Sequence, residues 1–197
     1  LSRGLGDVYK RQIHNLIEMI AVEGITQWRD RASKDLTDAW WCKLLEMGVS
    51  VDQKDSALDK VSRAYKVMLE SDTFAWIVNA DHCQRKNEWC LSRLYVDAKN
   101  DMSANLSVVA AQTIERSVID CSFIDGEQRR WIIDYKTSQP NQDEQLDSFL
   151  AREIDQYRSQ LLQYRDWVER YDQRTQQSVR EIKLALYFPL IDHLAVF

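Results

Sequence analysis

Residues 131–138 read Trp-Ile-Ile-Asp-Tyr-Lys-Thr-Ser, and this stretch decides how the fold is interpreted. Its apolar and aromatic beginning is typical of a buried β-strand, which ends in the charged residues Asp134 and Lys136. Because side chains alternate between the two faces of a strand, we expect Asp134 and Lys136 to share one face. Ile133 and Tyr135 should then occupy the other face.

The segment before this strand supplies a pairing partner. Asp125 and Gly126 lie between two runs that are rich in β-branched and aromatic residues, and an Asp-Gly dipeptide in that position is a strong hairpin signal. Asp120 lies on the first of these runs, so the hairpin can place it beside Asp134. Two carboxylates and the ammonium group of the D-x-K motif would then converge at one end of a sheet.

The remaining patterns predict a single domain of the α/β class. Helical spacing of apolar residues begins at Ile13, recurs in two more segments before residue 70, and returns in a long stripe over 150–171. Runs typical of strands lie at 89–95, 107–123, 130–137 and 182–188. No element is assigned to 73–78. The predicted order is extra N-terminal helices and then a core of helix, three strands, helix and strand.

The composition is that of a globular protein of 197 residues, 45% hydrophobic and 29% charged. No apolar run approaches the roughly 20 residues of a membrane helix, so we expect a cytoplasmic protein with no membrane partner. The four cysteines lack C-x-x-C spacing, which argues against zinc and favours reduced thiols. The formal net charge of −5 counts against nucleic-acid binding, although a phosphate-facing surface need only be locally positive.

Residues 1–12 differ from the rest of the chain. They hold two of the five glycines, lack apolar periodicity and stop abruptly before a strong helical pattern. Their sequence is similar to translated sequencing-adapter read-through. We therefore interpret residues 1–12 as non-native and 13–197 as the folded domain, which would be a C-terminal fragment of a longer protein.

Asp120, Asp134 and Lys136 together suit the hydrolysis of a phosphodiester. Mg²⁺ prefers oxygen ligands and keeps several waters, so two carboxylates and a substrate phosphate can hold it. The ion can acidify an attacking water, and a nearby lysine can stabilise charge on the phosphate. A plainer interpretation is an ordinary hairpin with an exposed Asp–Lys pair, which a D-x-K motif alone does not exclude.

In this context the quoted stretch resembles the nuclease signature of RecB-type helicase–nucleases, which belong to the PD-(D/E)XK superfamily. That superfamily has a core of helix, three strands, helix and strand. The resemblance covers 13–197 and implies that Asp120, Asp134 and Lys136 are catalytic. The two carboxylates and the carbonyl oxygen of Tyr135 would bind Mg²⁺, with Mn²⁺ as an alternative.

The segment that begins Ile-His-Asn-Leu-Ile-Glu at residue 13 extends the resemblance, which implies that His14 is a further metal ligand. Glu88 resembles an acidic residue that often precedes the first strand in this family. One departure is Cys121, which follows Asp120 where the family commonly has Arg. In the plainer interpretation His14 is a structural or surface histidine, because Mg²⁺ prefers oxygen.

Gln160 and Tyr164 match the Gln-x-x-x-Tyr motif that follows the D-x-K strand in the family, and Tyr157 precedes them. Positions i and i+4 are neighbours on a helix, so both side chains can approach the site together. The resemblance implies that Gln160, Tyr164 and Tyr157 contact DNA, with the tyrosines stacking on unpaired bases. The alternative is that Tyr164 is a core aromatic residue and Gln160 its solvated neighbour.

The resemblance implies the C-terminal nuclease or exonuclease domain of a UvrD/RecB/AddA-type helicase–nuclease in double-strand-break repair and recombination. The chain holds no G-x-x-x-x-G-K-[ST] motif, so an ATP-dependent helicase would lie in missing sequence of the same protein. Single-stranded DNA, that helicase portion and a second subunit are the expected partners. No iron–sulfur cluster is expected, since the characteristic late cysteine group is missing. The alternatives are a catalytically silent nuclease-like domain that binds DNA or a partner subunit, and an α/β interaction domain with no site.

Overall fold

A group of helices precedes the sheet in the chain. The computed structural model describes residues 5–31, 33–96 and 112–197. The N-terminal helices are α1 (Leu5–Glu23), α2 (Ile25–Arg29), α3 (Ser33–Glu46), the short 3₁₀ helix η1 (Val51–Gln53), α4 (Lys54–Glu70) and α5 (Asp72–Ile77). Within these described ranges, none of the helices is long and apolar enough to cross a membrane.

The described strands form one mixed sheet in the order β1-β2-β3-β4-β5. They are β1 (Cys83–Val96), β2 (Gln112–Ile124), β3 (Arg129–Tyr135), β4 (Glu181–Phe188) and β5 (His193–Val196). Neighbouring strands are antiparallel except for β3 and β4, which are parallel. The long helix α6 (Leu146–Arg174) makes the crossover between β3 and β4, since parallel neighbours need such a connection.

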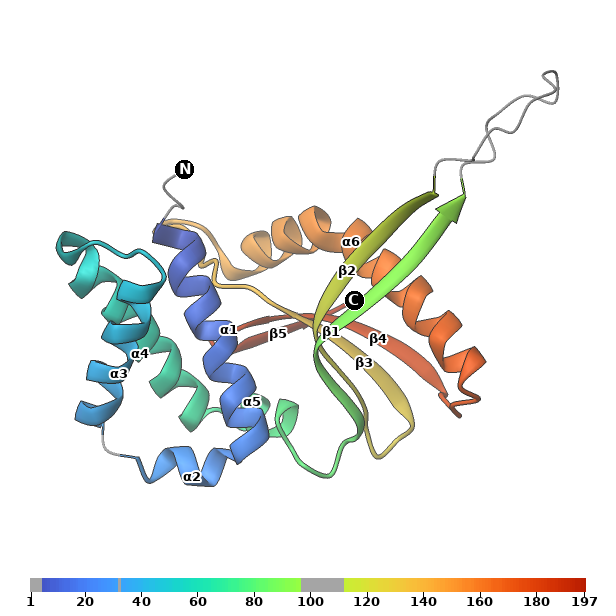
Figure 1. The fold of residues 1–197 in the computed structure, drawn as a ribbon, viewed down its shortest axis with the longest axis horizontal. Helices are drawn as coiled ribbons and strands as arrows, with labels where there is room; N and C mark the ends of the chain where they lie inside the picture. Colours follow the sequence, from blue (N-terminus) through green and yellow to red (C-terminus); the bar gives the residue numbers. More distant parts are fainter. Residues whose placement is uncertain (1–4, 32, 97–111) are drawn as a thin grey trace, which may run out of the picture.

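Helices cover both faces of the sheet, which confirms the predicted α/β class (Figure 1). Ile133 and Tyr135 pack with side chains of α1 and α4 on one face. Ile132 packs with Leu161 and other residues of α6 on the opposite face. The alternation predicted for the D-x-K strand is therefore confirmed, and it fixes which way Asp134 projects.

The predicted order of helices, three strands, helix and strand is found, and β5 follows it. The sequence did not predict β5, because its run of four residues is too short to show alternation. The unassigned segment 73–78 lies almost entirely in α5. The predicted strand over 107–123 corresponds to β2, but 107–111 lies outside the described residues. All four cysteines are unpaired in the structure.

Helix α1 corrects one expectation, because the helix does not begin at Ile13. It begins at Leu5 and therefore extends into the segment that we interpret as non-native. Val8 lies two turns before Leu16 on the same helix face and is buried. The foreign origin of residues 1–12 stays a prediction.

The predicted Asp-Gly hairpin joins β2 to β3. Asp125 is 5% exposed and accepts hydrogen bonds from the backbone N–H groups of Glu127 and Arg129. It also accepts from Nε of Arg129 at 2.7 Å and from Nε1 of Trp131 at 2.8 Å. These four donors hold the turn closed and fix the register that carries Asp120 toward Asp134.

Candidate metal centre

Asp120 and Asp134 lie at the same end of the β2–β3 pair. Cys121 pairs with Ile133 in the ladder, so the next step along the strands brings Asp120 opposite Asp134. The backbone N–H of Tyr135 donates a 2.7 Å hydrogen bond to Oδ2 of Asp120. The hairpin therefore brings the two predicted carboxylates together, and β3 itself holds the carboxylate of β2.

Lys136 follows the end of β3 and is buried together with Asp134. Its Nζ lies 2.6 Å from Oδ2 of Asp134, and it also lies 3.6 Å from the ring centroid of Tyr157 on α6. Oδ2 of Asp134 is buried and is engaged by this ammonium group in an ion pair. The backbone N–H of Lys136 donates to the carbonyl of Tyr187, which continues the parallel ladder past β3.

His14 reaches this end of the sheet from α1. Its Nε2 lies 3.1 Å from the carbonyl oxygen of Tyr135, and its Nδ1 lies 3.7 Å from Oδ1 of Asp120. Burial, and then the charge of Lys10, lower the pKa of His14 to about 4, so the ring is neutral near pH 7 and the approach to Asp120 is not an ion pair. A neutral ring that donates from Nε2 leaves the lone pair of Nδ1 facing Asp120.

This hydrogen bond has the form that orients metal-binding histidines in proteins, where the second ring nitrogen donates to a carbonyl or carboxylate. It also engages the carbonyl of Tyr135, which was expected to be a metal ligand. The ligand role of Tyr135 therefore stays a prediction, whereas its role in holding His14 and Asp120 is visible in the contacts of its two backbone groups.

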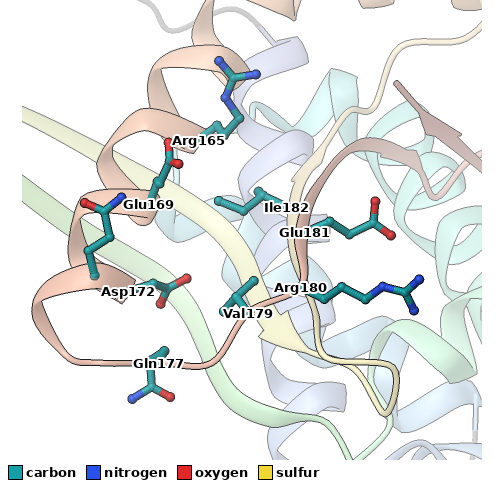
Figure 2. A pocket seen from close by; sticks show the side chains of 9 residues that line it. Arg165, Glu169, Asp172, Gln177, Val179, Arg180, Glu181 and Ile182 are labelled. Atoms are coloured by element: carbon teal, nitrogen blue, oxygen red, sulfur yellow. The ribbon is translucent and has the colours of Figure 1, made fainter.

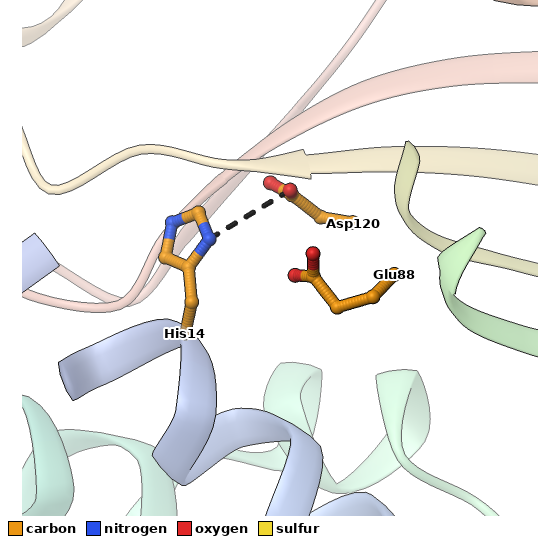
Figure 3. Close-up of side chains that lie close together, drawn as sticks. All are labelled: His14, Glu88 and Asp120. Carbon is orange, nitrogen blue, oxygen red and sulfur yellow. Dashed lines mark ion pairs between the residues drawn. The ribbon is translucent and has the colours of Figure 1, made fainter. Parts of the chain in front are cut away.

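Glu88 completes the cluster from β1. One ligand atom from each of His14, Glu88 and Asp120 lies within 4.8 Å of the other two (Figure 3). The register of β1 on β2 pairs Asn87 with Cys121, which places Glu88 opposite Asp120. Glu88 has a φ of 45°, a left-handed conformation that costs free energy for a residue with a side chain.

Burial and nearby negative charges raise the pKa of Asp120 and of Glu88. Burial, and then the charge of Asp134, raise the pKa of Asp120 to about 8, although the hydrogen bond from Tyr135 acts in the opposite direction. Burial, followed by the charges of Glu18 and Asp134, raises the pKa of Glu88. A bound cation would remove this repulsion, so the electrostatics favour a positively charged ligand among these side chains.

The predicted motif on α6 lies beside the cluster. The amide of Gln160 donates to the hydroxyl of Tyr164. Burial, together with the charges of Asp134, Asp120 and Glu88, raises the pKa of Tyr164. The ring of Tyr164 is 4% exposed and belongs to the core under α6, so it does not fit the predicted stacking on a base. The hydroxyl and its partner Gln160 are the parts that can face a substrate.

Glu153 is a buried carboxylate that the sequence interpretation missed. Its Oε2 accepts a 2.6 Å hydrogen bond from the hydroxyl of Ser138, and its Oε1 lies 2.6 Å from Nη1 of Arg152. Ser138 lies two residues after Lys136, so Glu153 ties the end of the D-x-K segment to α6. The only sequence signal for Glu153 was its spacing, since it precedes the partly buried stripe residue Tyr157 by one helical turn.

A hollow lies elsewhere, where α6 turns into β4 (Figure 2). Its volume is about 440 Å³, and its lining includes Arg165, Glu169, Asp172 and Arg180. Arg165 and Arg180 point in different directions in Figure 2, and the carboxylate of Asp172 is taken up by Arg130. Its charged groups do not converge on one point, so the candidate centre is the cluster of His14, Glu88 and Asp120, where the β2–β3 ladder ends.

Comparison of the chain with protein-family models and with curated protein sequences found no match.

Proposed function

We propose that this chain is a metal-dependent deoxyribonuclease domain of the RecB-like PD-(D/E)XK type. One observation carries the proposal, namely the convergence of His14, Glu88 and Asp120 beside the Asp134–Lys136 pair. The element order, with α6 between the parallel strands β3 and β4, supports the superfamily core. An interaction domain without a site has no reason to gather three acids, a neutral imidazole and an ammonium at one sheet end.

The donor set fits a divalent cation. Glu88 and Asp120 offer hard oxygen ligands, and Nδ1 of His14 offers a neutral nitrogen. Carboxylates with imidazole suit Mn²⁺ as well as Mg²⁺. Asp134 lies outside this group, because its Oδ2 is buried and pairs with Nζ of Lys136 at 2.6 Å, so its ligand role stays a prediction. When bound, the ion would acidify a water and screen the charge of a phosphodiester.

The protein groups around the ion would orient the substrate. Lys136 is buried and held by Asp134 and the Tyr157 ring, so its ammonium is fixed where a phosphate oxygen could approach. The Tyr135 amide fixes Asp120, and the Tyr135 carbonyl fixes His14. Positioning of this kind accounts for much of the catalysis of phosphate-ester reactions, because the reacting groups are already aligned before the transition state is reached.

The resemblance extends the proposal to the C-terminal domain of a helicase–nuclease in double-strand-break repair. In that role the domain would cut single strands that emerge from a motor on another part of the protein. The excess of acidic over basic residues supports an arrangement in which that other part of the protein makes most of the contacts with DNA.

The test is cleavage of a labelled single-stranded oligonucleotide by the full chain in Mg²⁺ or Mn²⁺. Asp134→Asn and Lys136→Met are expected to lower cleavage on the order of 10²-fold or more, as is usual when a charge-stabilising group is removed from an active site. Chelation by EDTA should abolish cleavage. Asp143→Asn, a matched change at an exposed residue of the loop after Lys136, should leave it unchanged.

Thermal melting of each variant controls for loss of the fold. Equal cleavage by the unmodified chain and by folded Asp134→Asn would refute the enzyme. Metal-dependent DNA binding without cleavage would instead support the catalytically silent alternative.

A further inference from the structure

A second surface, distinct from the metal cluster, lies between β1 and the C-terminal half of α6. It is a groove of about 220 Å³ lined by Leu91, Ser92, Trp167, Arg170, Tyr171 and Arg174. The groove combines an apolar floor with a cationic rim, and none of its residues belongs to the predicted motif on α6.

Among the described residues, the rim arginines have no acidic partners. Arg170 and Arg174 are exposed and one turn apart, and neither makes an ion pair or side-chain hydrogen bond within the described residues. Arg152 and Arg165 on the same helix do pair with acidic side chains. Neighbouring like charges at i and i+4 repel each other, so this surface is suited to an anionic ligand.

Aromatic side chains form the floor. Tyr171 packs edge-on against Trp89 with ring centroids 4.8 Å apart, and Trp167 is nearly buried beside it. Leu91 packs into the same core cluster from β1. A fixed apolar floor beneath two guanidinium groups suits a flat base attached to a phosphate, which is the chemistry of an unpaired nucleotide.

Both walls of the groove start at the metal cluster. Glu88 and Ser92 lie on β1, about 13 Å apart at the strand rise of about 3.3 Å per residue. Tyr164 and Arg174 lie on α6, about 15 Å apart at the helical rise of about 1.5 Å per residue. The groove is therefore a continuation of the site, a few nucleotides away.

We propose that this groove binds the phosphates and bases of a single DNA strand whose scissile phosphate lies at the metal cluster. The inference rests on the proposed function, because it supplies the path of that enzyme's substrate. Arg170 and Arg174 bind phosphates in this arrangement, and the partly exposed ring of Tyr171 supports a base between them.

The experiment measures binding of fluorescein-labelled dT20 to the full chain in EDTA, where no cleavage can occur. The double variant Arg170→Gln/Arg174→Gln is expected to bind about tenfold more weakly than the unmodified chain. Each lost phosphate contact should lower the slope of log affinity against log salt by about 0.7, so the double variant should lose about 1.4. Arg165→Gln, an exposed α6 arginine that is paired with Asp166, is the matched control.

An unchanged affinity and salt slope in the double variant would overturn the inference, and so would an equal loss of affinity for a 20-base-pair duplex. Cleavage is measured separately with Mn²⁺. If the double variant loses dT20 binding but the unmodified chain never cuts DNA, the groove is supported and the nuclease proposal is refuted. If the unmodified chain cuts DNA and the double variant binds dT20 as tightly as it does, the nuclease proposal is supported and the groove is refuted.

Discussion

The backbone N–H of Tyr135 donates a 2.7 Å hydrogen bond to Oδ2 of Asp120. This bond joins β3 to a carboxylate of β2 beyond the last ladder pair in that direction, Cys121 with Ile133. The same residue accepts a contact from His14 through its carbonyl oxygen. Tyr135 therefore organises two candidate metal ligands with its backbone, while its ring is buried and packs edge-on against the ring of His14.

This geometry predicts that metal binding and stability respond differently to substitutions at Asp120. Asp120→Asn keeps an oxygen that can accept from Tyr135, whereas Asp120→Ala leaves a largely buried N–H unpaired, at a cost of about 1–3 kcal/mol. Urea unfolding without metal should therefore separate the two variants by about that amount. Both variants should lose the rise in melting temperature that Mn²⁺ gives the unmodified chain.

A Mn²⁺-induced rise of equal size in Asp120→Asn would show that this carboxylate is no ligand. Asp143→Asn again serves as the control, because that side chain is exposed and remote from the hydrogen bond to Tyr135.

Glu88 offers a way to separate backbone strain from ligand chemistry. Its φ of 45° disfavours most side chains but is tolerated by Asn. Glu88→Asn should leave the free energy of unfolding unchanged or raise it by up to about 1 kcal/mol, whereas Glu88→Gln keeps the strain. Both should weaken Mn²⁺ binding, since both remove the charge, and calorimetric titration would measure this loss. Mn²⁺ affinity equal to that of the unmodified chain in both variants would exclude Glu88 from the site.

The D-x-K strand, its hairpin and the helix behind it could be predicted because local spacing reports their burial. Alternation predicted the opposite faces of Ile133 and Asp134, and Asp125-Gly126 predicted the turn. These elements depend on residues that are close together in the sequence.

The remaining parts of the site depend on contacts that spacing does not report. His14 and Tyr135 are separated by 121 positions, and their approach requires α1 to pack on the sheet. Glu88 lies opposite Asp120 only because β1 pairs with β2 in one register. Glu153 has the sequence environment of a solvated helix residue, yet it is 2% exposed and hydrogen-bonded to Ser138.

The turn residue Asp125 predicts a specific loss of stability in acid. Burial works against its ionisation, but hydrogen bonds from Trp131 and Arg129 outweigh this and lower its pKa to about 2, from an ordinary value of 3.8. A carboxyl whose pKa is lower in the folded state stabilises the fold above pH 4 and loses that stabilisation as the pH falls toward 2. The contribution above pH 4 is about 2 kcal/mol.

Urea unfolding of the unmodified chain and of Asp125→Asn, at a series of pH values, measures this contribution. The difference in unfolding free energy should be about 2 kcal/mol at pH 6 and should shrink toward zero near pH 2. Glu127→Gln, at an exposed side chain of the same turn, should show little such difference. A gap between Asp125→Asn and the unmodified chain that is independent of pH would contradict the assignment to ionisation.

The buried pair of Arg130 and Asp172 ties β3 to the end of α6 and predicts strong coupling between the two positions. Nε of Arg130 donates to Oδ2 of Asp172 at 3.0 Å and Nη2 donates to Oδ1, and neither residue is more than 5% exposed. Removing one partner leaves a buried charge, so Arg130→Met and Asp172→Leu should each cost about 3–5 kcal/mol. The double variant should recover most of that loss, because apolar side chains of similar size can replace a buried ion pair.

Urea unfolding of all four proteins gives the coupling energy directly. Additive losses below about 1 kcal/mol each would contradict this prediction. They would mean that water in the hollow beside Asp172 already solvates the pair, and that apolar contacts alone hold α6 against β3.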